Sequence, residues 1–426
     1  MMQSVWNTTA ELPRFPSLDK EIKVKVLIIG GGMSGLLTAY FLHHQGVDYA
    51  LVEKSRLMGG TSGNTTAKLT AQHGLIYHKL KDPAGYLRAN LDALQEYERL
   101  CSKIKCNYHK RDNYVYSVDN RQKLEQELEI LHRIGYPASY VKKLPLPIQT
   151  AGAVCFPGQA EFHPLQFAAE LAKDLHIYEN TAVLQMIGNT AITEKAKIRA
   201  DKVIVATHFP FINKHGSYFL KLYQHRSYVL ALKNAQDLNG MYVDDNKTGL
   251  SFRNYNEYLL LGGGGHRTGQ QGGNWNELRN FVHHYYPKAK EVCFWSAQDC
   301  MSLDDMPYIG EYSMFSKGLY VACGFNKWGM TGSMVAAMLL SDLVTEKKNE
   351  YAQLFNPSRS ILQPQLLVNG FEAAKNLLSS SPKRCPHMGC ALKWNAPEHS
   401  WDCPCHGSRF TKSGELLENP ATGNLR

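Results

Sequence analysis

Two cysteine–histidine pairs near the end of the chain have residue types and spacing that suit metal chemistry. Cys385 and His387 form a C-x-H pair, and after fifteen further residues Cys403 and His406 form a C-x-x-H pair. Two thiolates and two imidazoles in paired loops suit a [2Fe–2S] centre in which the cysteines bind one iron and the histidines the other. Structural zinc would use the same four residues. The nearby prolines and glycines and two additional cysteines favour the iron–sulfur interpretation.

A second chemical signature lies near the N-terminus, where glycines follow a β-rich apolar run at residues 24–29. Gly30, Gly32 and Gly35 have the G-x-G-x-x-G spacing. Glycines let the backbone approach a pyrophosphate, and amide groups at the start of the following helix attract its charge. Glu53, 18 residues past Gly35 at the end of a second predicted strand, can accept a hydrogen bond from a ribose hydroxyl. The pattern predicts a dinucleotide-binding unit.

Two further segments offer small and hydroxyl residues to a cofactor. Residues 58–67 follow the strand that ends in the acid, so we interpret them as a cofactor loop rather than a surface turn. Residues 323–332 form a glycine-rich turn that opens an apolar helix, a second place to hold negative charge. His73 follows the first loop. It is either an acid–base group or a buried structural histidine.

The rest of the chain must supply the elements that position these residues. Its 426 residues, 44% hydrophobic and 20% charged, are ordinary for a globular protein with two or three domains. Apolar residues at helical spacing predict helices at 86–104 and 121–135. Strands are predicted at 197–206, and three or four antiparallel strands at 223–265. Residues 295–310 are predicted to be rich in loops.

Composition also excludes several classes of protein. The net charge of +9 is modest, and the basic residues are scattered, so we expect no nucleic-acid binding. The N-terminus lacks a secretory signal, no segment resembles a membrane span, and the expected location is the cytoplasm. Four of the ten cysteines lie within residues 385–405, which is typical of a metal site rather than of a secreted disulfide framework.

Taken together, the motifs at residues 22–345 resemble the glycine-oxidase, sarcosine-oxidase and D-amino-acid-oxidase group of flavoproteins. The motifs that carry this resemblance are VLIIGGGMSGLLTAYFL with Glu53, GGTSGNTTA, VIVATHFPF, LDDMPYIG and LYVACGFNKWGMTG. The resemblance implies an α/β fold in which FAD lies along a GR2-type dinucleotide fold with an inserted antiparallel-sheet substrate domain. The residues that it assigns to FAD binding are Gly30, Gly32, Ser34, Gly35, Glu53, Lys54, Gly60, Thr61, Ser62, Asn64, Thr65, Val183, Thr207, Gly324, Gly329, Met330 and Thr331.

The positions that match the catalytic residues of that group hold different residues here, so the resemblance does not identify the catalytic residues of this chain. Arg267 stands where relatives place an oxygen-activating lysine, and Thr331 stands where they place a lysine for the substrate carboxylate. Lys327 is close to the second position but out of register. Cys300 resembles the flavin-attaching cysteine of some relatives, although its spacing differs. The candidates for catalysis are His73, Arg267 and Lys327.

The tail strongly resembles the Rieske group in its cytochrome-bc-like form. That resemblance assigns Cys385, His387, Cys403 and His406 as cluster ligands. It also pairs two further cysteines in a disulfide that joins the two cluster loops. The cysteines of this disulfide are Cys390 and Cys405.

The surroundings of the cluster predict its potential and its support. In the Rieske group a serine and an aromatic hydroxyl donate hydrogen bonds to the cluster. Ser408 is present here but Phe410 lacks the hydroxyl, so we expect a potential below the top of the Rieske range of about −150 to +300 mV. Most of the usual supporting strands are missing, because the chain ends sixteen residues past Phe410. The small all-β tail therefore either docks on the flavoprotein or is a remnant with a labile cluster.

These observations predict a division into four parts. They are an N-terminal arm at 1–21, a flavoprotein at 22–345, a linker at 346–384 and the Rieske segment at 385–426. Within the flavoprotein, the expected FAD-binding parts are 22–85, 150–213 and 301–345, and the expected substrate parts are 86–149 and 214–300.

The predicted function is that of an FAD-dependent oxidoreductase with a Rieske [2Fe–2S] cluster. It would oxidise an amine or amino-acid-like substrate and pass electrons singly to an acceptor protein or a quinone. One alternative is an oxygen-using flavin amine oxidase with a vestigial tail. Another is a non-enzymatic redox sensor or electron-transfer module. A separate NAD(P)H domain is not expected, because the glycines at 262–265 precede no predicted helix and lack the third glycine of the spacing.

Overall fold

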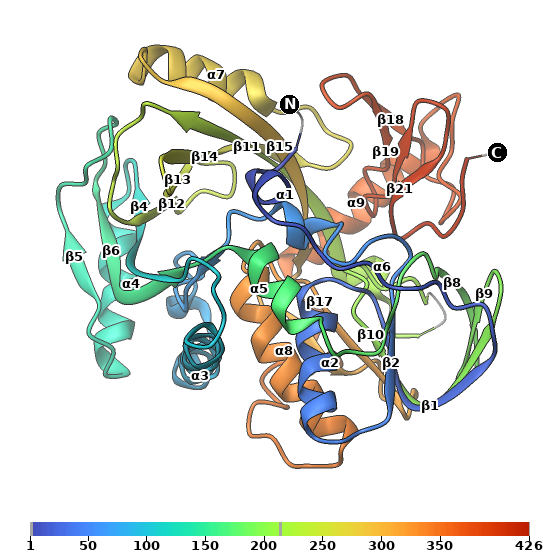
Figure 1. The fold of residues 1–426 in the computed structure, drawn as a ribbon. Helices are drawn as coiled ribbons and strands as arrows, with labels where there is room; N and C mark the ends of the chain where they lie inside the picture. The colour runs from blue at the N-terminus through green and yellow to red at the C-terminus, as the bar shows by residue number, and fades with distance from the viewer. Residues whose placement is uncertain (1–2, 213–214, 426) are drawn as a thin grey trace.

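The computed structural model describes residues 3–212 and 215–425. The chain forms three β-sheets with helices packed between and around them, as Figure 1 shows. Two sheets are formed by strands within residues 22–323, and the third is a small all-β sheet near the C-terminus. The predicted α/β fold with a small all-β tail is confirmed.

The first sheet has eight strands and contains the dinucleotide unit. Its parallel core pairs β1 with β2 and β10, β10 with β17, and β2 with β7, while β16 and the β8–β9 hairpin are antiparallel additions. The strands are β1 (Ile22–Ile29), β2 (Tyr49–Val52), β7 (Ile177–Tyr178), β8 (Val183–Ile187), β9 (Thr190–Thr193), β10 (Lys197–Val205), β16 (Tyr308–Glu311) and β17 (Leu319–Cys323).

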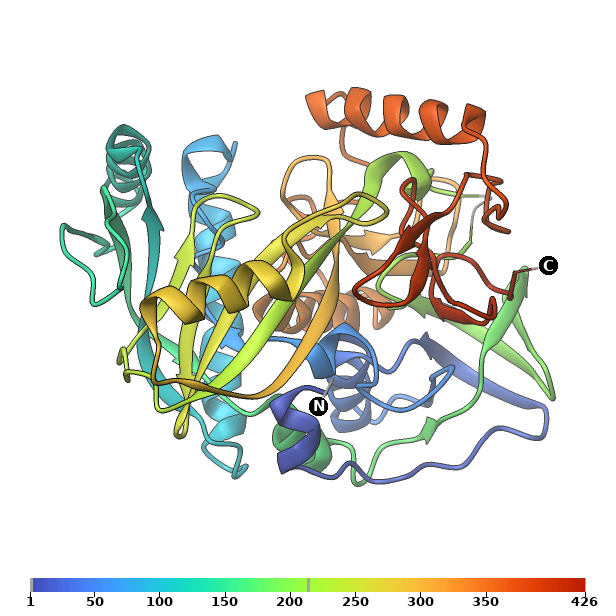
Figure 2. The same ribbon diagram turned by 90° about the horizontal axis from the view of Figure 1, so that it is seen from above.

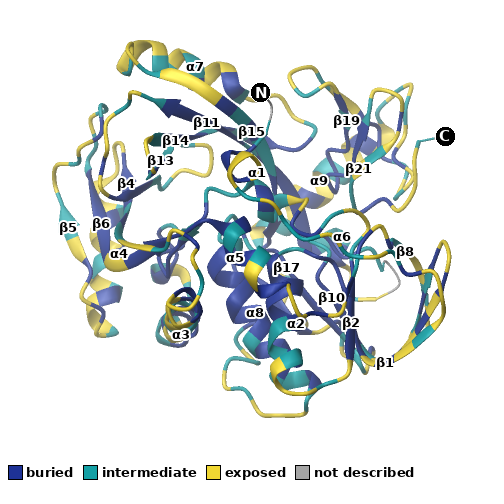
Figure 3. Ribbon diagram, viewed as in Figure 1, coloured by how far each residue is buried: buried dark blue, intermediate teal, exposed yellow. Residues whose placement is uncertain are grey.

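Two buried helices pack together beside this sheet. α2 (Met33–His44) follows the glycine turn, and α8 (Gly329–Val344) follows the second glycine-rich turn. Most residues of both helices are buried; Figure 3 shows α8 largely dark blue in the interior, whereas the last turns of α2 are partly teal and yellow. α3 (Pro83–Cys101) packs against α8, and α5 (Pro164–Leu171) packs against α2. Both ligand-facing helix starts are therefore held by a continuous apolar core.

The second sheet has nine strands and lies beside the first (Figure 1). It is flanked by α4 (Arg121–Arg133) and α7 (Asn274–Tyr285). Its strands are β3 (Lys68–Leu69), β4 (His109–Ser117), β5 (Ser139–Val141), β6 (Gly152–Glu161), β11 (Leu222–Lys233), β12 (Met241–Asp244), β13 (Ser251–Tyr255), β14 (Tyr258–Arg267) and β15 (Lys290–Ser302).

Strand β15 corrects one prediction. Residues 295–302 were expected to lie in a loop-rich segment, but they continue β15, which pairs with β11 from Leu222 opposite Ser302 to Lys233 opposite Lys290. The polar residues of this stretch obscure the apolar alternation of a strand. Pairing with a strand about seventy residues away, which no local pattern displays, supplies the hydrogen bonds.

The C-terminal part contains one helix and the third sheet. α9 (Pro364–Leu378) lies within the segment predicted to be a linker, and Pro364 is well suited to its first helical turn. The four-stranded sheet consists of β18 (Lys393–Asn395), β19 (Ser400–Asp402), β20 (Arg409–Thr411) and β21 (Leu416–Glu418).

Four short helical turns complete the described chain. They are α1 (Val5–Thr9), η1 (Thr61–Asn64), η2 (Tyr77–Lys79) and α6 (Tyr218–Lys221). Among the helices of residues 3–212 and 215–425, none has the length and apolar character needed to cross a membrane.

Candidate active site and metal centre

The glycine turn between β1 and α2 forms a cradle for a dinucleotide. A Cβ atom on Gly35 would lie 1.9 Å from the carbonyl oxygen of Gly30, so only glycine allows this close approach of helix and strand. The Oε2 atom of Glu53 accepts a hydrogen bond of 2.7 Å from the amide of Gly31. The Oε1 atom of Glu53 accepts from the amide and the hydroxyl of Ser55 over 2.9 and 3.1 Å. A carboxylate has about four acceptor positions, so one remains for a ribose hydroxyl.

The loop at residues 58–67 closes over this cradle. The amide of Met33, at the start of α2, donates to Ser62 Oγ over 2.9 Å. Thr61 Oγ1 donates to the carbonyl of Gln298 in β15 over 2.8 Å, so the loop joins the two sheets. The hydroxyl of Ser34 is buried and has no hydrogen-bond partner among the described residues. The glycine cradle and this unpartnered hydroxyl fit the pyrophosphate of FAD.

A cavity of about 270 Å³ extends from this loop between the two sheets. Its walls include charged residues that motif reasoning did not single out, among them Lys68, Lys247 and Asp299. Burial lowers the pKa of Lys68 to about 7, so much of this amine is neutral near pH 7. The residues assigned from sequence to FAD or catalysis that line the cavity are Thr61, Ser62, Asn64, Thr65, His73, Lys327, Gly329 and Met330.

His73 lies at the cavity wall with both ring nitrogens engaged. Its Nε2 atom lies 2.8 Å from the carbonyl of Thr70 and must donate, so Nδ1 accepts from the hydroxyl of Tyr86 over 2.6 Å. Its ring stacks on Trp328 with centroids 5.1 Å apart. Burial lowers the pKa of His73 to about 3, and the ring is neutral. Both ring nitrogens of His73 are therefore occupied by partners within the chain.

The other two catalytic candidates occupy different places. Lys327 lines the cavity, and its ammonium donates to the carbonyl of Lys247 over 2.7 Å. Arg267 is absent from the described cavity walls and extends toward the C-terminal part. There its guanidinium contacts the Pro404 carbonyl at 3.3 Å and the Asn369 side chain at 3.0 Å. The structure therefore places Lys327 with the cavity and Arg267 at the interface with the tail.

The remaining residues assigned to FAD are not among those that line the cavity. Thr331, in the first turn of α8, donates to the carbonyl of Thr70 over 2.9 Å. Lys54 instead donates to the Leu417 carbonyl of the tail over 3.3 Å. Val183 lies partly buried in the β8–β9 hairpin. Those outside the described cavity walls are Gly30, Gly32, Ser34, Gly35, Glu53, Lys54, Gly60, Val183, Thr207, Gly324 and Thr331.

The two cysteine–histidine pairs of the tail come together in the structure. The thiols of Cys385 and Cys403 are in hydrogen-bond contact and both are buried. The rings of His387 and His406 have centroids 4.9 Å apart at an interplanar angle of 89°. The Nδ1 atom of His406 is buried and has no hydrogen-bond partner among the described residues. Two thiols beside two imidazoles fit the mixed ligation of a [2Fe–2S] centre.

A disulfide joins the two cluster loops. Cys390 and Cys405 are bonded, as the resemblance implied. Their sulfurs also lie within 4.8 Å of the Cys403 sulfur, which groups these three atoms geometrically. Disulfide sulfurs cannot act as thiolate ligands, however, and Cys385 and Cys403 are the two cysteines of these loops that are free.

The histidine side of this centre faces the flavoprotein. The ring of Phe209, in the loop that follows β10, lies 6.5 Å from the ring of His387 and 6.2 Å from that of His406. The ring of Phe219 lies 6.4 Å from His406 on the same side. The cluster loops thus dock beside the strand that ends at the dinucleotide cradle.

Gln298 connects this docked loop to the cofactor loop. The side-chain Nε2 atom of Gln298 donates to the carbonyl of Gly407 over 2.8 Å. The backbone carbonyl of Gln298 accepts a hydrogen bond from Thr61. A Cβ atom on Gly407 would lie 2.2 Å from Cγ of Gln224, so a glycine is required at this contact. His208, a cavity-lining residue, bonds the same Gln224 over 3.1 Å. Motif reasoning missed these glutamines because neither belongs to a recognisable pattern.

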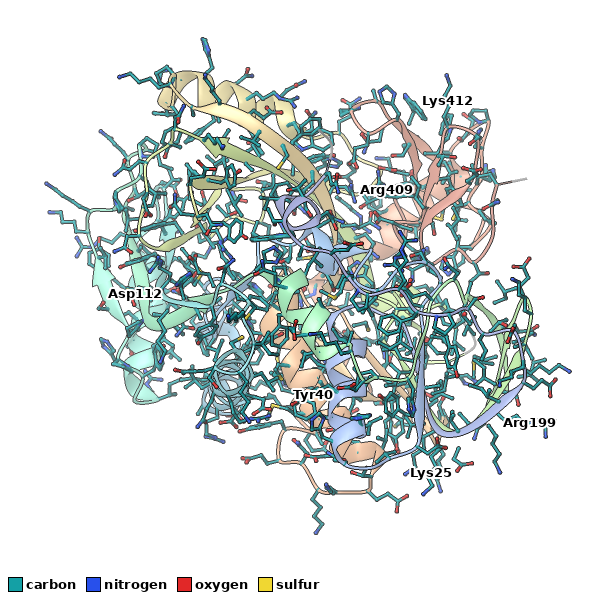
Figure 4. All side chains as sticks on the ribbon, viewed as in Figure 1. Lys25, Tyr40, Asp112, Arg199, Arg409 and Lys412 are labelled. Carbon is teal, nitrogen blue, oxygen red and sulfur yellow. A yellow bond between two sulfur atoms is a disulfide. The ribbon has the colours of Figure 1, made fainter. Side chains whose placement is uncertain are left out.

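A buried ion network secures the tail to β11. The carboxylate of Glu398 pairs with Arg226 of β11 and with Arg409 of β20, and its side chain is 2% exposed. Tyr228 also donates to Glu398 over 2.9 Å. Burial alone would raise the pKa of Glu398, but the two arginines lower it well below the usual value. Figure 4 labels Arg409 between the small sheet and the flavoprotein.

Comparisons with known proteins define the class. The chain matches the family described as FAD dependent oxidoreductase over residues 25–343, and the Rieske [2Fe-2S] domain over residues 359–426. The chain therefore belongs to the FAD-dependent oxidoreductase family and carries a C-terminal Rieske domain. Its cofactors are FAD and a [2Fe–2S] cluster, in agreement with the residues present in the two sites.

Individual relatives share different extents of the chain. The "Putative Rieske 2Fe-2S iron-sulfur protein YhfW" of Bacillus subtilis is 33% identical, over all of this chain and 97% of that protein. The cytochrome b6-f complex iron-sulfur subunit 1 of a Nostoc species is 44% identical over 41 residues, which are 10% of this chain and 23% of that protein. The chain spans about a quarter of the cytochrome subunit, so that likeness is confined to a short segment.

Solved structures resemble the flavoprotein part. Glycine oxidase from Geobacillus kaustophilus superposes with a TM-score of 0.68 at 20% identity, covering 80% of this chain and 99% of that chain. L-proline dehydrogenase from P. horikoshii gives a TM-score of 0.68 at 16% identity, covering 81% and 98%. At these identities the likeness shows the fold alone.

Proposed function

We propose that this oxidoreductase oxidises a small amine or amino-acid-like substrate at FAD and passes the electrons one at a time to its own Rieske cluster. The observation that carries the proposal is the docking of the histidine side of the cluster site against Phe209, in the loop that follows β10. FAD supplies a two-electron acceptor and the cluster a one-electron carrier, so an acceptor protein or a quinone completes the scheme.

The residues that would hold FAD are those of the cradle and its loop. Gly30, Gly32 and Gly35 would face the pyrophosphate, and Glu53 the adenosine ribose. The start of α8, near Thr331, would direct its positive end toward the flavin ring. The cluster ligands in this proposal are Cys385, His387, Cys403 and His406.

The cavity supports a small charged substrate. Lys327 makes one hydrogen bond to a backbone carbonyl among the described residues, and an ammonium has three donors, so it can also bind a carboxylate. Asp299 lies on the same cavity wall and can attract a substrate ammonium group. The neighbours named glycine oxidase and L-proline dehydrogenase, together with the L-amino acid deaminase from Proteus vulgaris, support an amino-acid-like substrate.

Two hydrogen bonds, both made by Gln298, link the cofactor loop to the cluster loop. Thr61 of the cofactor loop bonds Gln298, and Gln298 bonds Gly407 next to the ligand His406. We infer that Gln298 positions the two loops relative to each other, because one residue contacts both. The same contact excludes water between them, since Gln298 is 1% exposed.

Anaerobic titration of the holoprotein tests the proposal. The purified protein, with both cofactors, is mixed with a panel of amines and amino acids while flavin absorbance and the electron paramagnetic resonance of the reduced cluster are recorded. We expect one class of substrate to bleach the flavin and then to produce the cluster signal. Flavin bleaching without any cluster signal would favour an oxygen-using oxidase with a vestigial tail. No response to any substrate, with both centres responding to applied potential, would favour a sensor.

A further inference from the structure

Helix α9 has the reverse of the usual amphipathic arrangement. Leu367, Phe371 and Leu378 follow helical spacing along one face, and they are 77%, 69% and 88% exposed. Asn369 and Asn376, on the opposite face, are buried. In Figure 2 the orange-red helix runs along the upper edge of the molecule, with its outer face uncovered. We call the exposed residues Leu367, Val368, Phe371, Leu377 and Leu378 the apolar stripe.

Polar contacts hold the helix in this orientation. The side chain of Asn369 accepts from Arg267 over 3.0 Å and donates to the carbonyl of Leu220 over 3.3 Å. The amide of Ala391 donates to the carbonyl of Asn376 over 2.9 Å. Turning the apolar stripe inward would break these bonds, so its exposure is built into the fold. Exposed apolar patches of this kind mark interaction sites.

The apolar stripe continues to the first cluster loop. Arg384 donates to the carbonyls of Leu377 and Gly389, which ties the end of α9 to the loop that carries His387. Met388, next to that ligand, is exposed. Whatever covers the stripe therefore also comes close to the cluster loop. The opposite, histidine side of the cluster site is covered by the flavoprotein.

The chain segment that carries the stripe has a net positive charge. Residues 360–395 contain Lys375, Lys383, Arg384 and Lys393 but a single acidic residue, Glu372. Glu372 lies on the inner side, where Gln270 donates to it over 3.3 Å. A surface helix with Leu and Phe on one face and flanking Lys and Arg has the features of helices that lie in the plane of anionic lipid bilayers.

We propose that α9 docks on an anionic membrane surface and thereby presents the cluster loop to a lipid-soluble electron acceptor. Charge complementarity favours lipid over a second copy of the chain, because two copies joined through this face would place their basic residues against each other. The binding itself is independent of the proposed redox function. The chemistry of the acceptor, a quinone-like molecule dissolved in the bilayer, rests on that function.

Sedimentation with lipid vesicles tests the proposal. The holoprotein is mixed with phosphatidylcholine vesicles with and without phosphatidylglycerol, and the bound fraction is measured. We expect binding to the anionic vesicles, and a loss of affinity of about tenfold or more in the double variant Phe371→Ser with Leu378→Ser, which keeps every charge. The matched control is Phe315→Ser, because Phe315 is 87% exposed in another loop and should leave binding unchanged.

Three results would overturn the docking proposal. The wild-type protein could fail to bind the vesicles. The double variant could bind as well as wild type, which would show that the positive charge alone causes binding and that the apolar stripe does not contribute. Alternatively, analytical ultracentrifugation could show a dimer that the double variant dissociates, which would assign the stripe to a second copy. Intact flavin and cluster spectra in the variant show that it is folded. Failure of electron transfer with retained vesicle binding would count against the proposed function alone.

Discussion

The flavoprotein part and the cluster segment are stabilised in different ways. The flavoprotein part buries two interlocked sheets and the helices α2 and α8 in a large core of its own. The cluster segment has four short strands and a small core made largely of its cysteines. About forty residues rarely fold alone without metals or disulfides. The comparison teaches that the segment depends on its cluster, its disulfide and its docking surface, whereas the flavin site depends on local backbone geometry.

The largest expected effect comes from removing a cluster ligand. Cys403→Ser should abolish the cluster, because serine does not replace a buried thiolate ligand, while FAD remains bound to its separate core. Iron content and visible absorbance measure this. Cys101→Ser, a change at a free buried cysteine of α3, is the matched control and should keep both cofactors. Loss of FAD together with the cluster would show that the two regions are not independent.

The reciprocal change breaks the flavin site. Gly35→Ala places a methyl group 1.9 Å from the Gly30 carbonyl, so the α2 start must shift and FAD binding should fall at least about tenfold. Flavin content after dialysis reports this. Gly423→Ala, where a Cβ atom meets nothing within 4 Å, should have no effect. Retention of full flavin content in the Gly35 variant would contradict the assignment of the cradle.

The docking of the tail is tested at its buried ion network. Glu398→Gln removes the most buried carboxylate that Arg226 and Arg409 share, while both keep Glu418 and Arg409 keeps Asp402. Breaking a buried pair costs up to about 3–5 kcal/mol, and the remaining carboxylates reduce that cost here. We expect the tail to become susceptible to proteolysis while the flavin spectrum is unchanged. Glu129→Gln removes the exposed partner of Arg133 and should cost at most about 1 kcal/mol. Equal protease resistance in the two variants would show that Glu398 does not hold the tail on the flavoprotein.

The same carboxylate predicts how docking depends on acid. Because the folded pKa of Glu398 lies well below its unfolded value, its contribution to stability is complete above the unfolded pKa, near 4.5, and is lost as the pH falls toward the folded pKa. Protease resistance of the tail should therefore be constant from about pH 6 to 8 and decline below about pH 4.5. Glu398→Gln should flatten this acid decline. A decline between pH 6 and 8 would implicate another group.

The smallest expected effect concerns the bridge between the two regions. Gln298→Leu removes the donor to the Gly407 carbonyl, a loss of about 1–3 kcal/mol for a buried acceptor. Stopped-flow reduction of the cluster should slow severalfold, while the flavin is reduced at the wild-type rate. Gln185→Leu, at an exposed position of β8, is the control. An unchanged cluster rate would show that Gln298 does not position the loops.

Much of the chemistry could be predicted without coordinates, because it depends on residues close together in the chain. The glycine spacing, the acid at Glu53 and the cysteine–histidine pairs each lie within one or two short segments. Their conformations follow from local backbone rules, such as the need for glycine at a close approach. The mixed ligation of the cluster followed from the residues themselves, and the α/β fold, FAD and the disulfide followed from the family resemblances that these motifs carry.

The tertiary structure alone decided how the two sites are related. The pairing of Glu398 with Arg226 joins residues 172 positions apart, and the bond from Gln298 to Gly407 spans 109 positions. Which face of α9 points outward depends on where Asn369 and Asn376 find their hydrogen-bond partners. Such contacts have no local pattern, because burial of a charge or an amide is favourable only where the complete fold supplies its partner.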